Sequence, residues 1–278
     1  MVMHIGGRLY WERVGRDGPT LVFLHPLPHD LTCWTFQLAH FARWATCVAI
    51  DLPGLGRSPA SQRGLAMSDV AAACWNAVDE ARRGPAVIVG LSVGAVTAKH
   101  MANQRPEQVR ALVLTGGGYY GAGRPSFPVT KGIAPRHVPR YRSAGLAYRR
   151  EHFARNFTNA FRASVFYRYL VDVAIERGGD AESIVNLLLA LEEPDPPGLH
   201  AGIRAPTMIV CGSADRSRPA QEELARQIAD AEIRVIDGAG HCANLERPWD
   251  YDRHVAEFLR SRGLIAAEAA RALVAAGR

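Results

Sequence analysis

The chain has few cysteines and no long apolar run. Its five cysteines form no C-x-x-C pair and no His/Cys cluster with zinc-site spacing. We therefore predict reduced thiols and no metal site. No window approaches about 20 uninterrupted apolar residues, so no membrane span is expected. The first residues show neither the basic start nor the apolar core of a secretory signal, and we expect a cytoplasmic protein.

Lysine is nearly absent, because only Lys99 and Lys131 accompany the arginines behind the net charge of +6. The arginines are scattered, and no basic arm, aromatic RNA-binding signature or DNA-reading helix motif accompanies them. We interpret them as a solvated surface, with no nucleic-acid partner. The chain also lacks a G-x-G-x-x-G after its first strand and a P-loop, so no cofactor is predicted. The expected partner is a small-molecule substrate, and a homodimer is a candidate assembly.

Short apolar runs alternate with helix-compatible stretches through most of the 278 residues. After an opening hairpin over 5–14, the sequence predicts strands over 21–25, 47–51, 86–90, 110–115, 207–212 and 233–236. Strands separated by helices at this spacing indicate parallel βαβ units. The predicted fold class is α/β, with a mostly parallel sheet covered by helices on both faces.

This alternation stops after Gly116 and resumes only near residue 203. Between these points the sequence shows proline-rich loops and helix-like stretches near 144–160, 163–177 and 181–191. We interpret 118–202 as a helical cap inserted into a core formed by 1–117 and 203–278. A second, unrelated small domain is the alternative, but the strand pattern continues on both sides of the insert.

One turn organises the chain: Gly90-Leu91-Ser92-Val93-Gly94 follows an apolar strand and precedes a helix-compatible stretch. Two glycines flank the serine because a sharp strand-to-helix turn leaves little room for side chains. Backbone N–H groups at the start of the helix can stabilise an anion beside the hydroxyl. This G-x-S-x-G pattern is that of a nucleophile elbow. An ordinary loop serine is the alternative.

A serine hydroxyl is a poor nucleophile at neutral pH and needs a base, which a third group orients. Of the ten histidines, His241 lies in a glycine-containing loop just beyond the last predicted core strand. Asp215 and Asp237 both follow strands. We favour Asp215 as the acid, because Asp237 is so close to His241 in sequence that it more plausibly shapes the turn. The alternative for Asp215 is a helix-capping role.

These segments together resemble the α/β-hydrolase superfamily with a helical cap, over residues 5–262. The order Ser92, Asp215, His241 is the family's triad order. The loop Asp51-Leu52-Pro53-Gly54-Leu55-Gly56-Arg57-Ser58 resembles the family's D-x-P-G-x-G-x-S turn. The resemblance implies an α/β-hydrolase sheet and a catalytic triad.

The resemblance also implies an oxyanion hole of two backbone N–H groups. One belongs to Val93, directly after the serine, and the other to Leu27, which follows Pro26 where the family often has His-Gly-X. Nearby His29 either lines the substrate pocket or caps the following helix, and the sequence leaves both interpretations open.

A serine at the elbow implies acyl transfer, because relatives that form an alkyl-enzyme ester carry aspartate there. We predict a carboxylesterase or lactonase, with His241 as base and Asp215 orienting it. The segment after His241 resembles that of esterases and enol-lactone hydrolases. Carbon–carbon hydrolysis of ring-fission diketones is an alternative, although those enzymes often carry Trp where this chain has Cys242. A non-hydrolytic ligand-binding protein on the same fold is another.

Several arginines occur in the predicted cap, and one of them is a candidate partner for a substrate carboxylate. Solvated helix faces are the simpler interpretation. These arginines are Arg136, Arg140, Arg142, Arg149, Arg150 and Arg155.

Overall fold

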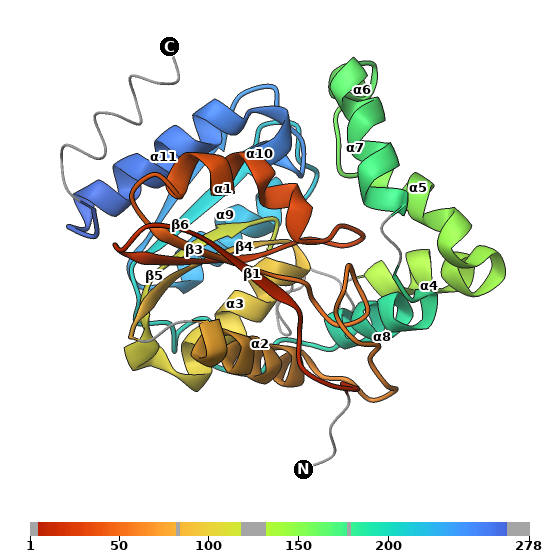
Figure 1. Cartoon of the computed structure of the whole chain (residues 1–278), viewed down its shortest axis with the longest axis horizontal. Helices are drawn as coiled ribbons and strands as arrows, with labels where there is room; N and C mark the ends of the chain where they lie inside the picture. The colour runs from red at the N-terminus through yellow and green to blue at the C-terminus, as the bar shows by residue number, and fades with distance from the viewer. Residues whose placement is uncertain (1–4, 82–83, 118–131, 177–178, 266–278) are drawn as a thin grey trace.

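A seven-stranded sheet forms the centre of the part of the chain that the structure, a computed structural model, describes (Figure 1). That part comprises residues 5–81, 84–117, 132–176 and 179–265. The strands follow the order β1-β3-β2-β4-β5-β6-β7, and every neighbouring pair is parallel except β1 with β3. They are β1 (Trp11–Gly15), β2 (Thr20–Leu24), β3 (Thr46–Ile50), β4 (Ala86–Leu91), β5 (Val109–Thr115), β6 (Thr207–Gly212) and β7 (Ala231–Ile236). The predicted fold class is confirmed.

Helices cover both faces of this sheet because the central strands are apolar on both sides. Along β2, Val22 and Leu24 join one buried cluster while Leu21 and Phe23 join the other. The first cluster packs against α2 (Met67–Ala81), α3 (Val93–Gln104) and α9 (Arg218–Gln227). The second packs against α1 (Thr35–Phe41), α10 (Ala243–Glu246) and α11 (Pro248–Ser261). Short 3-10 helices cover Leu31–Trp34 (η1), Pro106–Gln108 (η2) and Gly145–Tyr148 (η3).

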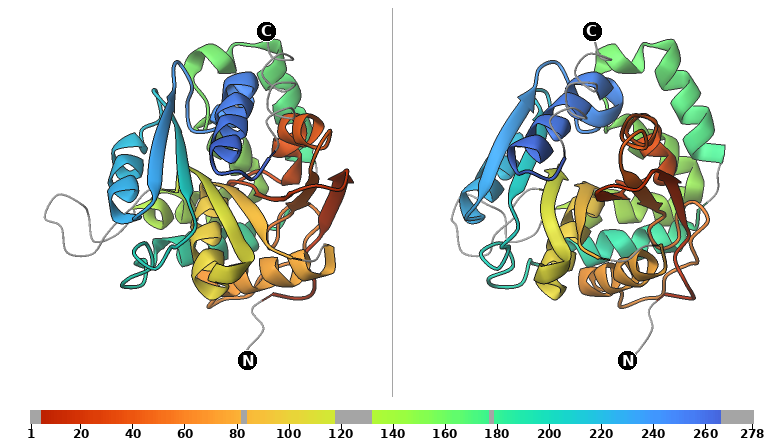
Figure 2. Two further views of the ribbon diagram at one scale, coloured as in Figure 1. Left: turned by 90° about the vertical axis from the view of Figure 1, so that its left-hand side faces the viewer. Right: turned by 60° about the vertical axis from the view of Figure 1, so that its left-hand side comes forward.

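Among the described residues between β5 and β6, five α-helices, here called the cap helices, lie beside the sheet in space, at the right of Figure 1. They are α4 (Ile133–Ala144), α5 (Arg149–Ala154), α6 (Asn159–Arg162), α7 (Val165–Glu176) and α8 (Ala181–Glu192). No strand occurs among the described residues between β5 and β6. Figure 2 shows α6 and α7 standing apart from the sheet. None of the helices described is both long and apolar enough to cross a membrane.

Helix α4 departs from the prediction, which placed proline-rich loops there. Pro135 is tolerated because the first N–H groups of a helix have no intrahelical partner. Those at Gly132, Ile133 and Ala134 donate instead to the carboxylate of Glu192 on α8, at 2.8–2.9 Å. A distant side chain thus caps a helix that its own sequence marks poorly. The proline-rich stretch before residue 132 lies outside the described residues.

The predicted opening hairpin is also wrong. Ile5 forms an isolated antiparallel bridge with Ser61, and β1 pairs with β3. Without β1, β3 would be an edge strand with unpaired N–H and C=O groups. β1 pairs with these groups of β3.

Candidate active site

Ser92 occupies the sharp turn between β4 and α3. Its backbone has φ 56° and ψ −115°, a conformation that non-glycine residues rarely adopt. A Cβ at Gly94 would lie 2.1 Å from the carbonyl oxygen of Leu24, and one at Gly90 would lie 2.4 Å from that of Gly94. Both glycines are therefore required by close backbone contacts. The serine N–H donates to the Thr115 carbonyl at 2.7 Å, which fixes the turn against β5.

Asp215 lies in the turn after β6, and His241 lies in the loop after β7. The Nδ1 of His241 donates to Oδ2 of Asp215 at 3.0 Å. The other carboxylate oxygen accepts from the backbone N–H and the hydroxyl of Ser217, at 2.8 and 2.9 Å. Asp237 is exposed and accepts a hydrogen bond from Ser213. The structure therefore brings Asp215, rather than Asp237, against the imidazole.

Gln221, on α9, is a member of this network that the sequence analysis missed. Its Nε2 donates to Oδ2 of Asp215 at 3.0 Å, and its Oε1 accepts from the backbone N–H of Gly116 at 2.9 Å. The side chain is fully buried. The only sequence signal is an amide three residues before the buried Leu224, on the same face of the helix.

The two ionisable groups shift each other's pKa in opposite directions. Burial works to raise the pKa of Asp215, but the His241 charge and the hydrogen bonds from His241 and Ser217 lower it to about 2. Burial works to lower the pKa of His241, and the Asp215 carboxylate outweighs it, so this pKa lies above the ordinary 6.5. Asp215 thus stays ionised near neutral pH and orients an imidazole whose Nδ1 carries the proton.

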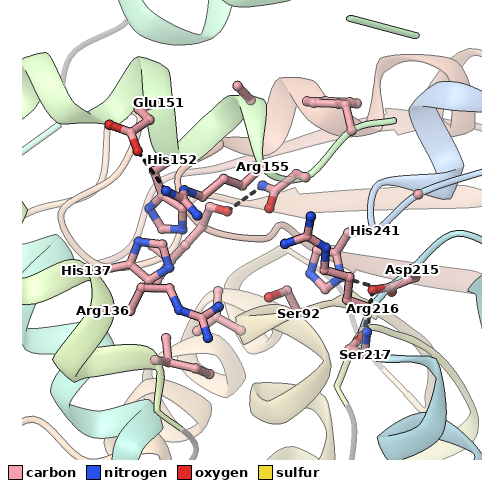
Figure 3. Close-up of a pocket in the computed structure, with 18 of the residues that line it drawn as sticks. Ser92, Arg136, His137, Glu151, His152, Arg155, Asp215, Arg216, Ser217 and His241 are labelled. Carbon is pink, nitrogen blue, oxygen red and sulfur yellow. Dashed lines mark hydrogen bonds and ion pairs between the residues drawn. The ribbon is translucent and has the colours of Figure 1, made fainter. Parts of the chain in front are cut away.

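A cavity of about 970 Å³ opens over this site, a volume suited to a small-molecule ligand. Ser92, His241, Leu27 and Val93 all line it. Figure 3 shows the Ser92 hydroxyl turned into the cavity, with His241 and Asp215 on one side of it. In unliganded enzymes the contact between nucleophile and base commonly tightens only when substrate binds.

His29 does not line this cavity, and neither interpretation offered for it holds. It is buried and stacks on Phe153 at a centroid distance of 4.4 Å, beside a separate cavity of about 160 Å³. The residue that caps the following 3-10 helix is Asp30, whose side chain accepts from Thr32. His29 packs against α5 as a neutral imidazole, because burial disfavours its charged form and holds its pKa well below 6.5.

The Asp51–Ser58 loop braces the segment that carries Leu27. The Asp51 carboxylate accepts from the backbone N–H groups of Leu31 and Arg57, at 2.8 and 2.9 Å. His25 donates from Nδ1 to the Pro26 carbonyl at 3.0 Å and accepts at Nε2 from the Leu52 N–H at 2.8 Å. The Asp51–Ser58 loop therefore holds the segment that carries Leu27 in place, although the loop itself does not line the cavity.

The placing of Ser92, Asp215 and His241 around one cavity agrees with the protein family that the sequence matches. The model of a family described as "Alpha/beta hydrolase family" matches residues 21–251. This chain belongs to the alpha/beta hydrolase family. The resemblance predicted from the G-x-S-x-G turn and the order of Ser92, Asp215 and His241 is confirmed at the level of the family.

Relatives of this alpha/beta hydrolase differ in their chemistry. It is 28% identical to a 2-hydroxy-6-oxononadienedioate/2-hydroxy-6-oxononatrienedioate hydrolase of Burkholderia vietnamiensis, over 91% of each chain. It is 27% identical to a pimeloyl-[acyl-carrier protein] methyl ester esterase of Chromobacterium violaceum, over 91% of this chain and 99% of the other. Its structure resembles an enol-lactonase from Burkholderia xenovorans with a TM-score of 0.79 and 21% identity, over 92% of this chain and 98% of that one. That last likeness concerns the fold alone.

Proposed function

We propose that this protein is a serine hydrolase that cleaves small carboxylic esters or lactones through an acyl-enzyme on Ser92. The observation that carries the proposal is the 3.0 Å hydrogen bond from His241 to Asp215, in the cavity that Ser92 also lines. A nucleophile, a base and a group orienting the base are the set that acyl transfer requires.

In the proposed reaction, the Ser92 oxygen attacks the substrate carbonyl while Nε2 of His241 takes the hydroxyl proton. Asp215 holds the proton on Nδ1 and stabilises the imidazolium that forms. The N–H groups of Leu27 and Val93 stabilise the oxyanion, and each such donor is worth about 3 kcal/mol. His241 then protonates the leaving alkoxide, and a water activated by the same imidazole releases the acid.

The cap helices supply much of the cavity wall in this proposal. Ile133 and Arg136 of α4, His152 of α5 and Leu188 of α8 all line it. We propose that the segment 118–202 acts as a lid that selects the substrate. The esterase relative of Chromobacterium violaceum supports an ester substrate.

A second candidate is hydrolysis of a carbon–carbon bond in a ring-fission diketone on the same three residues. It is favoured by one observation, the 28% identity to the dienedioate hydrolase over nearly the whole of both chains. Both candidates use the same nucleophile, so the choice of substrate separates them.

Turnover of a panel of p-nitrophenyl esters, lactones and a ring-fission diketone tests the proposal. Ser92→Ala is expected to lower kcat by at least about 10⁴-fold, whereas Ser143→Ala, an exposed serine on α4, leaves turnover unchanged. A fluorophosphonate should label wild type on the peptide containing Ser92. Turnover that survives Ser92→Ala contradicts the mechanism. A folded protein that turns over none of the panel and takes no label favours a binding protein instead.

A further inference from the structure

The cavity over Ser92 is lined by more cationic than anionic side chains. Its carboxylates are Asp215, which orients His241, and Glu151, which pairs with Arg140 and Arg155. The arginines that line it are Arg136, Arg155, Arg162 and Arg216. Both carboxylates are thus engaged, and the wall of the cavity remains electropositive.

Arg136 is distinguished from the other cap arginines by its position. In Figure 3 its guanidinium lies between His137 and Ser92, on the side of the serine opposite to His241 and Asp215. No acidic partner for it occurs among the residues described, whereas Arg155 is held by Glu151 at 2.8 Å. A guanidinium that faces a cavity and is not paired with a carboxylate of the described residues is well suited to bind an anionic group of a ligand in bidentate geometry.

The chemistry on Ser92 decides which part of a substrate reaches Arg136. His241 must protonate the leaving-group oxygen, so the leaving group lies on the imidazole side. The acyl chain then extends the other way, toward α4. Its path is apolar, because the cavity wall there includes Val96 of α3, Ile133 of α4 and Leu188 and Leu191 of α8.

Two buried histidines complete the end of this path. His137 and His152 stack at a centroid distance of 4.1 Å, and their Nδ1 atoms hydrogen-bond with the hydroxyls of Tyr148 and Tyr141, each at 2.9 Å. Burial lowers the pKa of His137 to about 4 and that of His152 well below 6.5, so both are neutral near neutral pH. A neutral imidazole that accepts from a tyrosine hydroxyl at Nδ1 carries its proton on Nε2, so His137, which lies next to Arg136 in Figure 3, has an N–H donor at Nε2.

We propose that the substrate is an ester or lactone whose acyl chain ends in a carboxylate, and that Arg136 binds this carboxylate. This inference rests on the proposed function, because it takes Ser92 as the nucleophile. An apolar chain with an anionic end fits the apolar path from Ser92 and the cationic group at its end.

Two esters matched in length test the inference: the mono-p-nitrophenyl ester of adipic acid and p-nitrophenyl hexanoate. Wild type should prefer the anionic ester in kcat/KM by on the order of tenfold, which is typical of a hydrogen bond to a charged group. In Arg136→Gln the ratio of the two values should fall toward one, mainly through KM, since the contact exists before and during the reaction. Arg136→Lys should keep part of the ratio. Arg142→Gln, on the same helix but outside the cavity, should keep all of it.

The outcomes separate this inference from the proposed function. Hexanoate turnover that depends on Ser92, with no preference for the adipate ester, overturns the inference and leaves the function standing. A preference unchanged by Arg136→Gln also overturns it. If neither these esters nor any compound of the panel is turned over and Ser92 takes no label, the function fails, and calorimetry decides the inference alone. Adipate must then bind wild type more tightly than hexanoate does and lose that advantage in Arg136→Gln. Equal binding of the two acids rejects the anion site.

Discussion

At the scale of single residues, the orientation of His241 depends on one carboxylate with four donors. Asp215 accepts from His241, Gln221 and twice from Ser217, which leaves it little freedom to turn. Asp215→Asn replaces the acceptor that keeps the proton on Nδ1. We expect kcat to fall by about 10³–10⁴-fold, because the imidazole then adopts the wrong tautomer. Steady-state kinetics on the best ester of the panel would measure this.

Asp237→Asn is the matched control for that experiment. Asp237 also follows a strand of the sheet edge, but it is exposed and bonds only to Ser213 among the residues described. We expect its kcat to stay close to that of wild type. If Asp237→Asn is the inactive variant and Asp215→Asn is not, the acid has been assigned to the wrong residue.

The residues predictable from sequence are those whose local pattern carries their chemistry. Ser92 is marked by its two glycines, and Asp215 and His241 by their places after strands. Gln221 and Arg136 carry no such mark. Folding alone brings the glutamine against Asp215 and places the arginine in the cavity wall, where we propose its role. Such roles depend on which face of a helix meets the site, and the spacing of apolar residues gives that only after the packing is known.

At the scale of elements, one half-buried carboxylate joins the cap side of the molecule to the loop of His241. Glu246 of α10 accepts from the Gly240 N–H at 3.1 Å, and from the N–H and hydroxyl of Thr158 at 3.0 and 2.6 Å. The Asn156 carbonyl accepts from the Cys242 N–H at 3.0 Å. The residues on either side of His241, Gly240 and Cys242, are therefore both linked by hydrogen bonds to the segment 156–158 or to Glu246, which binds it.

Glu246→Ala should both destabilise the fold and weaken catalysis. It leaves three donors without their acceptor. The Gly240 N–H is buried and Thr158 is half-buried, and an unsatisfied buried group costs about 1–3 kcal/mol. We expect a loss of about 2–4 kcal/mol in the free energy of unfolding by urea, together with a lower kcat. Glu246→Gln, which keeps one acceptor oxygen, should lie between. Glu193→Ala, an exposed glutamate, is the control. An alanine variant as stable and active as wild type would show that the hydrogen bonds of Glu246 to Gly240 and Thr158 are dispensable.

Helices and strands differ in how much of them the sequence predicts. The strand, turn and helix around Ser92 follow from adjacent residues, since the apolar run, the glycines and the helix formers are contiguous. Helix α4 does not, because Pro135 and Pro139 argue against it and its cap comes from Glu192, 58 residues or more away in sequence. A contact between distant elements outweighed the local propensity.

At the scale of the whole molecule, buried titratable groups make stability depend on pH in two opposing ways. Burial lowers the pKa of His40 and of His137 to about 4. The unfolded chain therefore binds more protons below pH 6.5, and these histidines remove stability as the pH falls. Asp252 of α11 acts in the other direction, because burial raises its pKa to about 7, although Gln37 donates to it at 2.9 Å. The folded chain holds that proton, so this group adds stability as the pH falls from 7 toward 4.

Asp252→Asn separates the contribution of Asp252 from that of His137. The Nδ1 of His40 lies 3.7 Å from the Asp252 carboxylate, so the substitution also changes the surroundings of that histidine. The amide keeps an oxygen for Gln37 and has no charge to bury, so the variant should unfold at a higher urea concentration than wild type at pH 8. Toward pH 5 its advantage should shrink, by on the order of 1 kcal/mol per pH unit, because the wild-type carboxyl becomes protonated. Because Asp252 no longer adds stability as the pH falls, the free energy of unfolding of the variant should decrease more steeply on acidification than that of wild type. Urea unfolding at pH 8, 6.5 and 5 would measure both slopes, and parallel curves would mean that Asp252 is ionised in the fold without cost.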